Sequence, residues 1–166
     1  MSATFSWTVT NTSGAVSTDL GASGNLQNYQ NADLAGIAFY ATNPIVAGNN
    51  SFEVWLRAHI TGVFNLVRDF RFWQSTAFSP ATGLQIYWKG TQQIYLTPSS
   101  GTSSIATSSI PTADPGTANV SIGGNLSGSL TTSGYTDYIV TQLRTTVSAA
   151  AGDTSLTTVT LSYTEN

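Results

Sequence analysis

The stretch that decides the fold is residues 52–95, FEVWLRAHITGVFNLVRDFRFWQSTAFSPATGLQIYWKGTQQIY. Ten of the chain's eighteen aromatic residues lie in it, with six of its thirteen charged residues and its only histidine. Apolar and polar residues alternate from Phe52 to Thr61, and a period of two indicates a half-buried β-strand. We therefore expect this stretch to form the thickest part of an all-β core, from four consecutive strands.

Turn signals separate the four expected strands. Gly62 allows a bend or bulge, because glycine adopts backbone angles that other residues avoid. Lys89 and Gly90 are expected to join residues 84–88 and 93–96 in a hairpin. The second strand is expected to bury one face (Phe64, Leu66, Phe70 and Phe72) and to present the other (Asn65, Val67, Asp69, Arg71 and Trp73) outward.

The pattern in the rest of the chain also predicts short strands between turns. Residues 15–34 are expected to be a loop with a short strand. Strands with a period of two are predicted at residues 4–10, 34–40, 135–147 and 158–163. No apolar stripe occurs at helical spacing, and the turns are rich in Gly, Pro and Asn. The pattern predicts one domain over residues 1–166, an all-β, two-sheet antiparallel sandwich, with a jelly roll as its narrower form.

Residues 99–134 differ in character from the rest of the chain. They contain no aromatic residue, a single charge at Asp114, and many Ser, Thr, Gly and Ala residues. One interpretation is a long loop or flexible arm. The other is a run of short edge strands at residues 119–122 and 126–130. Either form would be a segment that serves a function or becomes ordered on binding a partner, because long structureless loops are uncommon inside compact domains.

Composition narrows the function classes. Only 8% of the residues are charged and the net charge is −3, so 21 serines and 26 threonines must keep the surface polar. Such a surface is poorly protected against association, which favours a protein packed against partners. The five basic residues are scattered and form no stripe for a phosphate backbone, so no nucleic-acid partner is expected.

The sequence also contains few signals for targeting or for covalent modification. The chain has no cysteine, which excludes disulfides and thiolate chemistry. We expect no signal peptide, because no basic segment followed by an apolar one opens the sequence. No apolar run approaches ~20 residues, so no membrane-spanning helix is expected. Asn-x-Ser/Thr sequons begin at Asn11, Asn49, Asn119 and Asn125, as chance predicts in such a composition.

The candidate catalytic groups are few. His59 would have to serve any Ser-His-Asp triad, with Asp69 or Asp137 as its carboxylate, but no Gly-x-Ser-x-Gly motif accompanies it. A glycosidase would need two facing carboxylates, for which Glu53 and Asp69 are the candidates. The three nearby arginines (Arg57, Arg68 and Arg71) favour a solvated ion cluster instead. We expect no enzyme, cofactor or metal site.

The aromatic residues leave one question open. Trp73, Tyr87 and Trp88 are the candidates for interface or ligand-stacking aromatics, because exposed aromatics anchor protein interfaces and stack on sugars. The alternative is that they fill the core from both sides. Both interpretations are consistent with the sequence.

Several short runs resemble tailed-bacteriophage virion proteins, closest in style to the head decoration proteins of the capsid. They are SGYTDYIVTQL at 133–143, AAAGDT at 149–154, TVTLSY at 158–163 with Glu165, FEVWLRAH at 52–59 and FRFW at 70–73. Together with the cysteine-free, hydroxyl-rich composition they cover about half of the chain. They contain no motif onto which site residues could be aligned.

The resemblance implies a non-enzymatic structural protein of a virus particle, made in the host cytoplasm. Such proteins bind and stabilise the capsid lattice as homo-oligomers, with trimers favoured, and their partners are the major capsid protein or other virion proteins. The rival reading is a carbohydrate-binding sandwich of a tail fibre or adhesin, with a glycan as its ligand. That reading rests on the Trp and Tyr residues between positions 73 and 95.

Overall fold

The computed structural model describes residues 2–12, 16–23, 27–36, 42–79, 81–102, 105–150 and 156–166. Within these residues the structure is all β, in two antiparallel sheets. The strands are β1 (Ala3–Asn11), β2 (Val16–Gly21), β3 (Val54–Gly62), β4 (Val67–Thr76), β5 (Leu84–Gln92), β6 (Ser108–Ser109), β7 (Ser129–Leu130), β8 (Gly134–Tyr135), β9 (Tyr138–Thr145) and β10 (Thr158–Glu165).

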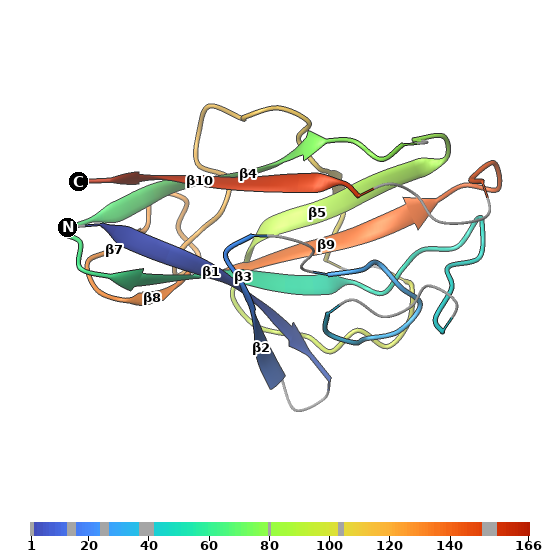
Figure 1. The fold of residues 1–166 in the computed structure, drawn as a ribbon, viewed down its shortest axis with the longest axis horizontal. Coiled ribbons are helices and arrows are strands. Elements are labelled where there is room, and N and C mark those ends of the chain that lie inside the picture. The colour runs from blue at the N-terminus through green and yellow to red at the C-terminus, as the bar shows by residue number, and fades with distance from the viewer. Residues whose placement is uncertain are drawn as a thin grey trace.

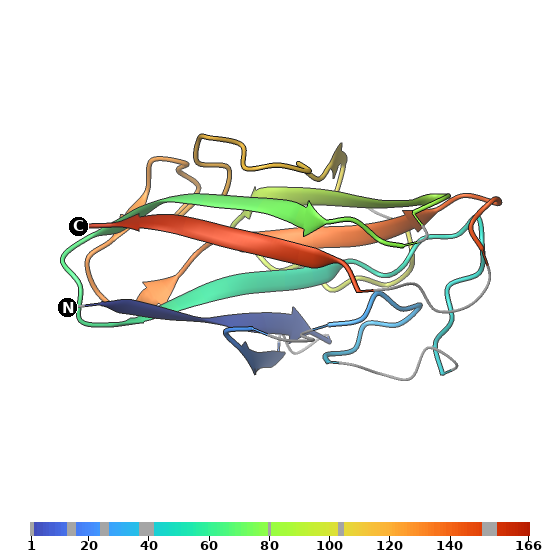
Figure 2. The ribbon, with the colours of Figure 1, turned by 45° about the horizontal axis from the view of Figure 1, so that its top comes forward.

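The two sheets lie face to face as the layers of a sandwich (Figures 1 and 2). The larger sheet has the order β2-β1-β3-β9-β5-β6, with β8 also paired to β3, and the smaller has the order β10-β4-β7. This confirms the predicted two-sheet antiparallel sandwich. Its seven-and-three division differs from the regular eight strands of a jelly roll.

The strands predicted on both flanks of the central stretch are confirmed. β1 directs Trp7 and Val9 into the core, and β10 packs Leu161 and Tyr163 against the same core cluster. β9 divides its residues between both faces, with Ile139 on the inner face. β2 is the short strand expected within residues 15–34. The strand predicted at 34–40 falls largely outside the described residues, and residues 34–36 are not in a strand.

The central stretch contains three strands rather than four, because the hairpin predicted at Lys89 and Gly90 is wrong. β5 runs through both residues to Gln92. A Cβ atom at Gly90 would lie 2.5 Å from the carbonyl oxygen of Asn119, and the Gly90 carbonyl accepts a hydrogen bond from Ser121 N–H at 3.0 Å. Gly90 therefore permits a close approach of another segment rather than a turn.

β4 departs from the predicted alternation because it contains two bulges. Its register with β10 shifts between Thr158 and Val159 and again between Ser162 and Thr164, and each time the extra residue is on β4. Asp69 sits at the second bulge with a φ of 59°, a left-handed conformation that Asp tolerates better than most residues. The bulge turns Val67 inward, where it is fully buried, so its predicted outward position is wrong.

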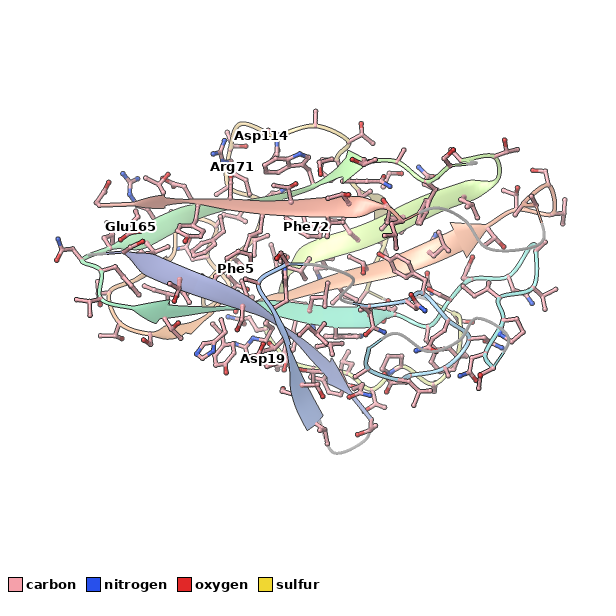
Figure 3. The ribbon with its side chains drawn as sticks, in the orientation of Figure 1. Phe5, Asp19, Arg71, Phe72, Asp114 and Glu165 are labelled. Carbon is pink, nitrogen blue, oxygen red and sulfur yellow. The ribbon has the colours of Figure 1, made fainter. Side chains whose placement is uncertain are left out.

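The core between the sheets combines aliphatic side chains with five buried aromatic ones (Trp7, Phe64, Phe70, Phe72 and Trp88). Phe72 of β4 lies 5.9 Å from the ring of Trp7 and 5.7 Å from that of Trp88, which belong to the opposite sheet. Figure 3 shows Phe5 and Phe72 directed into this space. Burying each such side chain contributes on the order of 1.5–3 kcal/mol, so these contacts hold the layers together.

The described part of residues 99–134 packs against the sandwich instead of forming a free arm. Ala106, Ile110 and Val120 are buried, and its strands are the two-residue β6 and β7 and the first residue of β8. Residues 119–122 do not form a strand. Gln74 N–H donates to the Pro111 carbonyl, and Ile110 N–H donates to the Ile86 carbonyl. The segment thereby closes the sandwich edge between β4 and β5.

Candidate functional site

The carboxylates that the structure describes all bind groups of their own chain. The acceptors and their partners are Asp19 with Ser6 and Gly21, Asp33 with Thr12 and Tyr95, Glu53 with Ile105 and Ala106, Asp69 with Arg68, Asp114 with Arg71 and Gly116, Asp137 with Ser121, Gly123 and Gly124, and Glu165 with Ala3. Most of these carboxylates therefore hold loops or chain ends in place, whereas Asp69 pairs with its neighbour Arg68 within β4.

Glu53 fixes a segment that covers the outer face of the larger sheet. We call residues 93–102 and 105–107 the covering segment. The Glu53 carboxylate, only 6% exposed, accepts hydrogen bonds from the N–H groups of Ile105 at 3.1 Å and Ala106 at 3.0 Å. The sequence placed Glu53 in a solvated ion cluster. That prediction is wrong, because the covering segment buries Glu53 and shields it from solvent.

Two side chains of β9 hold the same segment. Gln142 donates to the Gly101 carbonyl at 2.8 Å, and Arg144 donates to the Ala106 carbonyl at 2.7 Å. Beneath the segment, Trp55 packs with Tyr95 and Tyr138 at ring distances of 5.1 and 5.5 Å. The outer face of this half of the sheet is therefore a second, smaller core, which explains why Trp55 alternates with charged residues in the sequence.

Asp137 performs the same task on another loop. It is buried and accepts hydrogen bonds from Ser121 Oγ and from the N–H groups of Gly123 at 3.2 Å and Gly124 at 2.7 Å. Both glycines have positive φ, so their successive N–H groups form a concave cradle for the carboxylate. Asp137 is committed to this loop and does not orient His59.

His59 lies on the outer face of β3 and stacks on Tyr135. Their rings are 4.1 Å apart and nearly parallel. Ser6, directly opposite His59 on β1, donates its hydroxyl to Asp19. Asp69 belongs to the other sheet. The described structure therefore does not assemble the Ser-His-Asp geometry that a triad requires.

The other predicted pair, Glu53 and Asp69, is also separated. β3 and β4 belong to different sheets, so the expected approach on adjacent strands is wrong. Asp69 pairs with Arg68 at 3.0 Å, and Arg71 pairs with Asp114 at 2.8 Å on the outer side of the smaller sheet (Figure 3). Both pairs are partly exposed to solvent and contribute ~0–1 kcal/mol each.

The three candidate aromatics occupy three different environments. Trp88 is 8% exposed and lies in the inner core against Phe72, so its faces are not presented to solvent. Trp73 is half-buried on β4, opposite Thr160 of β10. Tyr87 is half-buried on the outer face of β5, where the guanidinium carbon of Arg144 lies 3.7 Å from its ring centroid. The structure does not bring the three together.

Tyr87 and Arg144 line a cavity of about 530 Å³ beside the turn between β4 and β5. Its apolar wall includes Phe78, Leu84 and Ile110, and its other lining residues include Gln74, Gln85, Thr112, Thr145 and Thr146. The volume lies within the range of small-molecule sites, and apolar walls with a few polar groups are typical of them.

A second surface lies on the uncovered half of the larger sheet. We call Arg57, His59 and Tyr135 the outer-face patch. The guanidinium carbon of Arg57 lies 4.8 Å from the Tyr135 ring centroid, and Tyr135 is 40% exposed. Hydroxyls of Thr4 and Thr61 pair beside it at 2.9 Å. Sequence reasoning missed Tyr135, because the irregular chain between β8 and β9 reverses the face that simple alternation assigns to it.

Burial shifts the pKa of several groups in the protein. It raises the pKa of Tyr29 to about 12 from an ordinary value of 10.0, against a weaker effect of a Thr141 hydrogen bond. It also raises the pKa of Tyr95 to about 12, with the Asp33 carboxylate adding to the shift. Burial likewise raises the pKa of Asp33, although Thr12 N–H donates to it at 2.7 Å.

No group of three or more metal-binding side chains occurs in the described ranges. Nor does any helix there have the length and apolar character to span a bilayer. Comparison of the chain with protein-family models, with curated proteins and with solved structures finds no match in any of the three.

Proposed function

We propose that this chain is a non-enzymatic structural protein of a virus particle, a capsid decoration protein that binds and stabilises the capsid lattice as an oligomer. The observation that supports the proposal is that the described carboxylates form hydrogen bonds and ion pairs with groups of their own chain. Glu53, Asp137 and Glu165 bind backbone N–H groups of distant segments rather than facing a common cleft.

The surface that remains is suited to extended contact. Hydroxyl-bearing residues line the outer side of β10 (Thr158, Thr160 and Thr164) and lie beside the outer-face patch (Thr4, Ser6 and Thr61). Burying hydroxyls costs less free energy than burying charges, so such faces can be covered by a partner without unpaired ions. Many identical weak contacts then give a stable shell through avidity.

The fold is compatible with this role. The described parts of the covering segment and of the segment at the β4–β5 edge both pack against the sandwich, so these parts need little ordering on binding. A preorganised surface loses less conformational entropy when it docks. The resemblance to head decoration proteins supplies the partner, a major capsid protein of a tailed phage.

The test is the composition of the particles encoded by the genome that carries this gene. Density-gradient-purified particles would be labelled with gold-conjugated antibody against the recombinant protein, beside particles from a phage with the gene deleted. Regular label on the heads, with deleted particles that release DNA at lower temperature, is the expected result. Absence of the protein from purified particles, or label confined to tails, would overturn the proposal.

A second candidate function is favoured by the cavity that Tyr87 and Arg144 line. A carbohydrate-binding module needs an aromatic face beside hydrogen-bonding side chains, and this cavity holds both. In that case the chain would belong to a tail fibre or adhesin and bind a glycan.

A glycan array separates the two candidates. Binding by the wild-type protein that is lost in Tyr87→Ala, and kept in Tyr135→Ala on the opposite half of the larger sheet, would establish the carbohydrate function. An array without specific signal leaves the cavity as a packing feature beside the β4–β5 turn.

A further inference from the structure

β10 (Thr158–Glu165) is an edge strand, and among the described residues β4 is the only strand that pairs with it. β10 runs along the border of the smaller sheet (Figures 1 and 2). The other border strand of that sheet, β7, has only two residues. An eight-residue edge carries a row of N–H and C=O groups that can pair with a further strand.

The corresponding edge of the larger sheet is protected, and β10 is not. β2 carries the charge of Asp19, has an extra residue at Leu20 in its register with β1, and ends at Gly21 with a φ of 81°. Charges, bulges and short length are the features that prevent edge pairing in natural sheets. β10 has no bulge of its own, no proline and no charge before Glu165.

The side chains of β10 are self-complementary in one antiparallel register. Val159, Leu161 and Tyr163 face the core, and Thr160 and Ser162 face outward. A two-fold axis through Leu161 places Leu161 opposite its own copy, Val159 opposite Tyr163, and Thr160 opposite Ser162. Apolar groups then meet apolar groups and hydroxyls meet hydroxyls, which are favourable cross-strand pairs.

Two further observations suit that register. Val159, Leu161 and Tyr163 are only partly buried in the single chain, so a neighbouring strand would cover apolar surface that remains open. The Oγ atom of Ser162 is buried and has no hydrogen-bond partner within the described structure. Buried polar atoms rarely stay unsatisfied. If the Ser162 side chain turns toward a paired strand, its hydroxyl can donate to that of the facing Thr160, which itself donates to Ser75 Oγ of its own chain at 2.8 Å.

We infer that two copies of this chain associate through antiparallel pairing of their β10 edges about a two-fold axis at Leu161, which joins the smaller sheets of both copies into one continuous sheet. The contact is isologous and closes on itself. It deepens the oligomeric part of the proposed function by naming the surface, and it can be tested on the free protein without capsids.

A pair of charge variants tests the register. Thr160→Lys with Ser162→Lys places like charges opposite each other across the axis, whereas Thr160→Lys with Ser162→Glu places opposite charges there. Sedimentation equilibrium is expected to show a dimer for the wild-type and Lys/Glu proteins and at least about tenfold weaker dimerisation for Lys/Lys. Circular dichroism melts check that both variants fold.

Cysteine cross-linking gives an independent measurement, because the chain has no native cysteine. Directly opposite residues of an antiparallel pair have Cα atoms ~4.5–5.5 Å apart, within disulfide range. Leu161→Cys is therefore expected to form a disulfide-linked dimer under mild oxidation. Thr158→Cys, which faces Thr164 in this register, is expected to remain monomeric on a non-reducing gel.

The inference would be overturned by a wild-type monomer, by a trimer that Lys/Lys leaves intact, or by equal association of the Lys/Lys and Lys/Glu variants. Those outcomes leave the antibody-labelling test of purified particles unaffected. Conversely, absence of the protein from particles would remove the decoration proposal and leave a β10-paired dimer in place.

Discussion

Both carboxylate oxygens of Glu165 lie 3.0 Å from the backbone nitrogen of Ala3, so the last strand of one sheet binds the first strand of the other. Figure 3 shows the Glu165 side chain beside the start of β1. Tyr163 adds a longer contact, its hydroxyl donating to the Ala3 carbonyl at 3.4 Å. These contacts hold the two sheets together on the side of the sandwich where no backbone pairing joins β1 to β10.

Replacing Glu165 tests this link. Glu165→Gln keeps the shape but removes the charge, so the hydrogen bond to Ala3 N–H weakens, and we expect unfolding to become easier by about 1 kcal/mol in urea titrations. Asp114→Asn is the matched control, because it removes one carboxylate from an exposed ion pair and is expected to change stability much less. Equal effects of the two variants would show that Glu165 acts only as a surface charge.

Removal of the Glu53 carboxylate is expected to release the covering segment. Glu53→Ala leaves the N–H groups of Ile105 and Ala106 without this acceptor, at a cost of about 1–3 kcal/mol. Limited proteolysis should then cut between residues 93 and 107 in the variant and not in the wild type. Glu53→Gln retains an acceptor oxygen and should protect the segment better than Glu53→Ala. If Glu53→Ala is as resistant as the wild type, Gln142 and Arg144 suffice.

A methyl group at Gly90 is expected to disrupt the edge between β4 and β5. The Cβ atom would lie 2.5 Å from the Asn119 carbonyl oxygen and 2.7 Å from the Trp88 ring, so the 119–121 backbone must move. Gly90→Ala should destabilise the fold by about 1–3 kcal/mol. Lys89→Ala, at the exposed neighbouring position, should stay within about 0.5 kcal/mol of the wild type. A neutral Gly90→Ala would mean that the 119–121 backbone moves aside without a measurable cost.

Alkaline pH is expected to destabilise the protein through two partly buried tyrosines. The pKa of Tyr29 and that of Tyr95 are raised to about 12, so the folded chain retains protons that the unfolded chain loses near pH 10. The stabilisation is therefore present below pH 10 and is lost as the pH rises toward 12. Urea midpoints at stepped pH, with tyrosinate absorbance, measure this. Tyr95→Phe should reduce the slope; an unchanged slope would assign it to other groups.

The alternation of side chains was sufficient to predict the sandwich, because a period of two follows directly from strand geometry. Trp7, Ile139 and Leu161 all lie on the faces that their positions indicate. Alternation failed where the backbone departs from regular pairing. The bulge at Asp69 turns Val67 inward, and the irregular chain before Asp137 turns Tyr135 outward. Bulges have no reliable sequence signal in a single chain.

The charged residues were harder to place than the apolar ones. Glu53 looked exposed because the opposite face of β3 was already assigned to the core. Its partners Ile105 and Ala106 lie about fifty positions away, in a segment whose composition indicated a loop or short edge strands but no contact with Glu53. The local sequence around a carboxylate does not distinguish one that is buried against a distant backbone segment from one that is exposed to solvent. The inner position of Trp88 was likewise left open by alternation.

The pairing of β4 with β10 has a consequence for biosynthesis. β4 emerges from the ribosome long before β10. Until β10 has been synthesised, Phe70 and Phe72 therefore lie on a strand whose pairing partner is missing. Contacts between distant parts of a chain form slowly, and an unpaired strand is prone to aggregate meanwhile. Expression yield should therefore depend strongly on temperature and on chaperone supply. The stability of the folded protein should depend on them less.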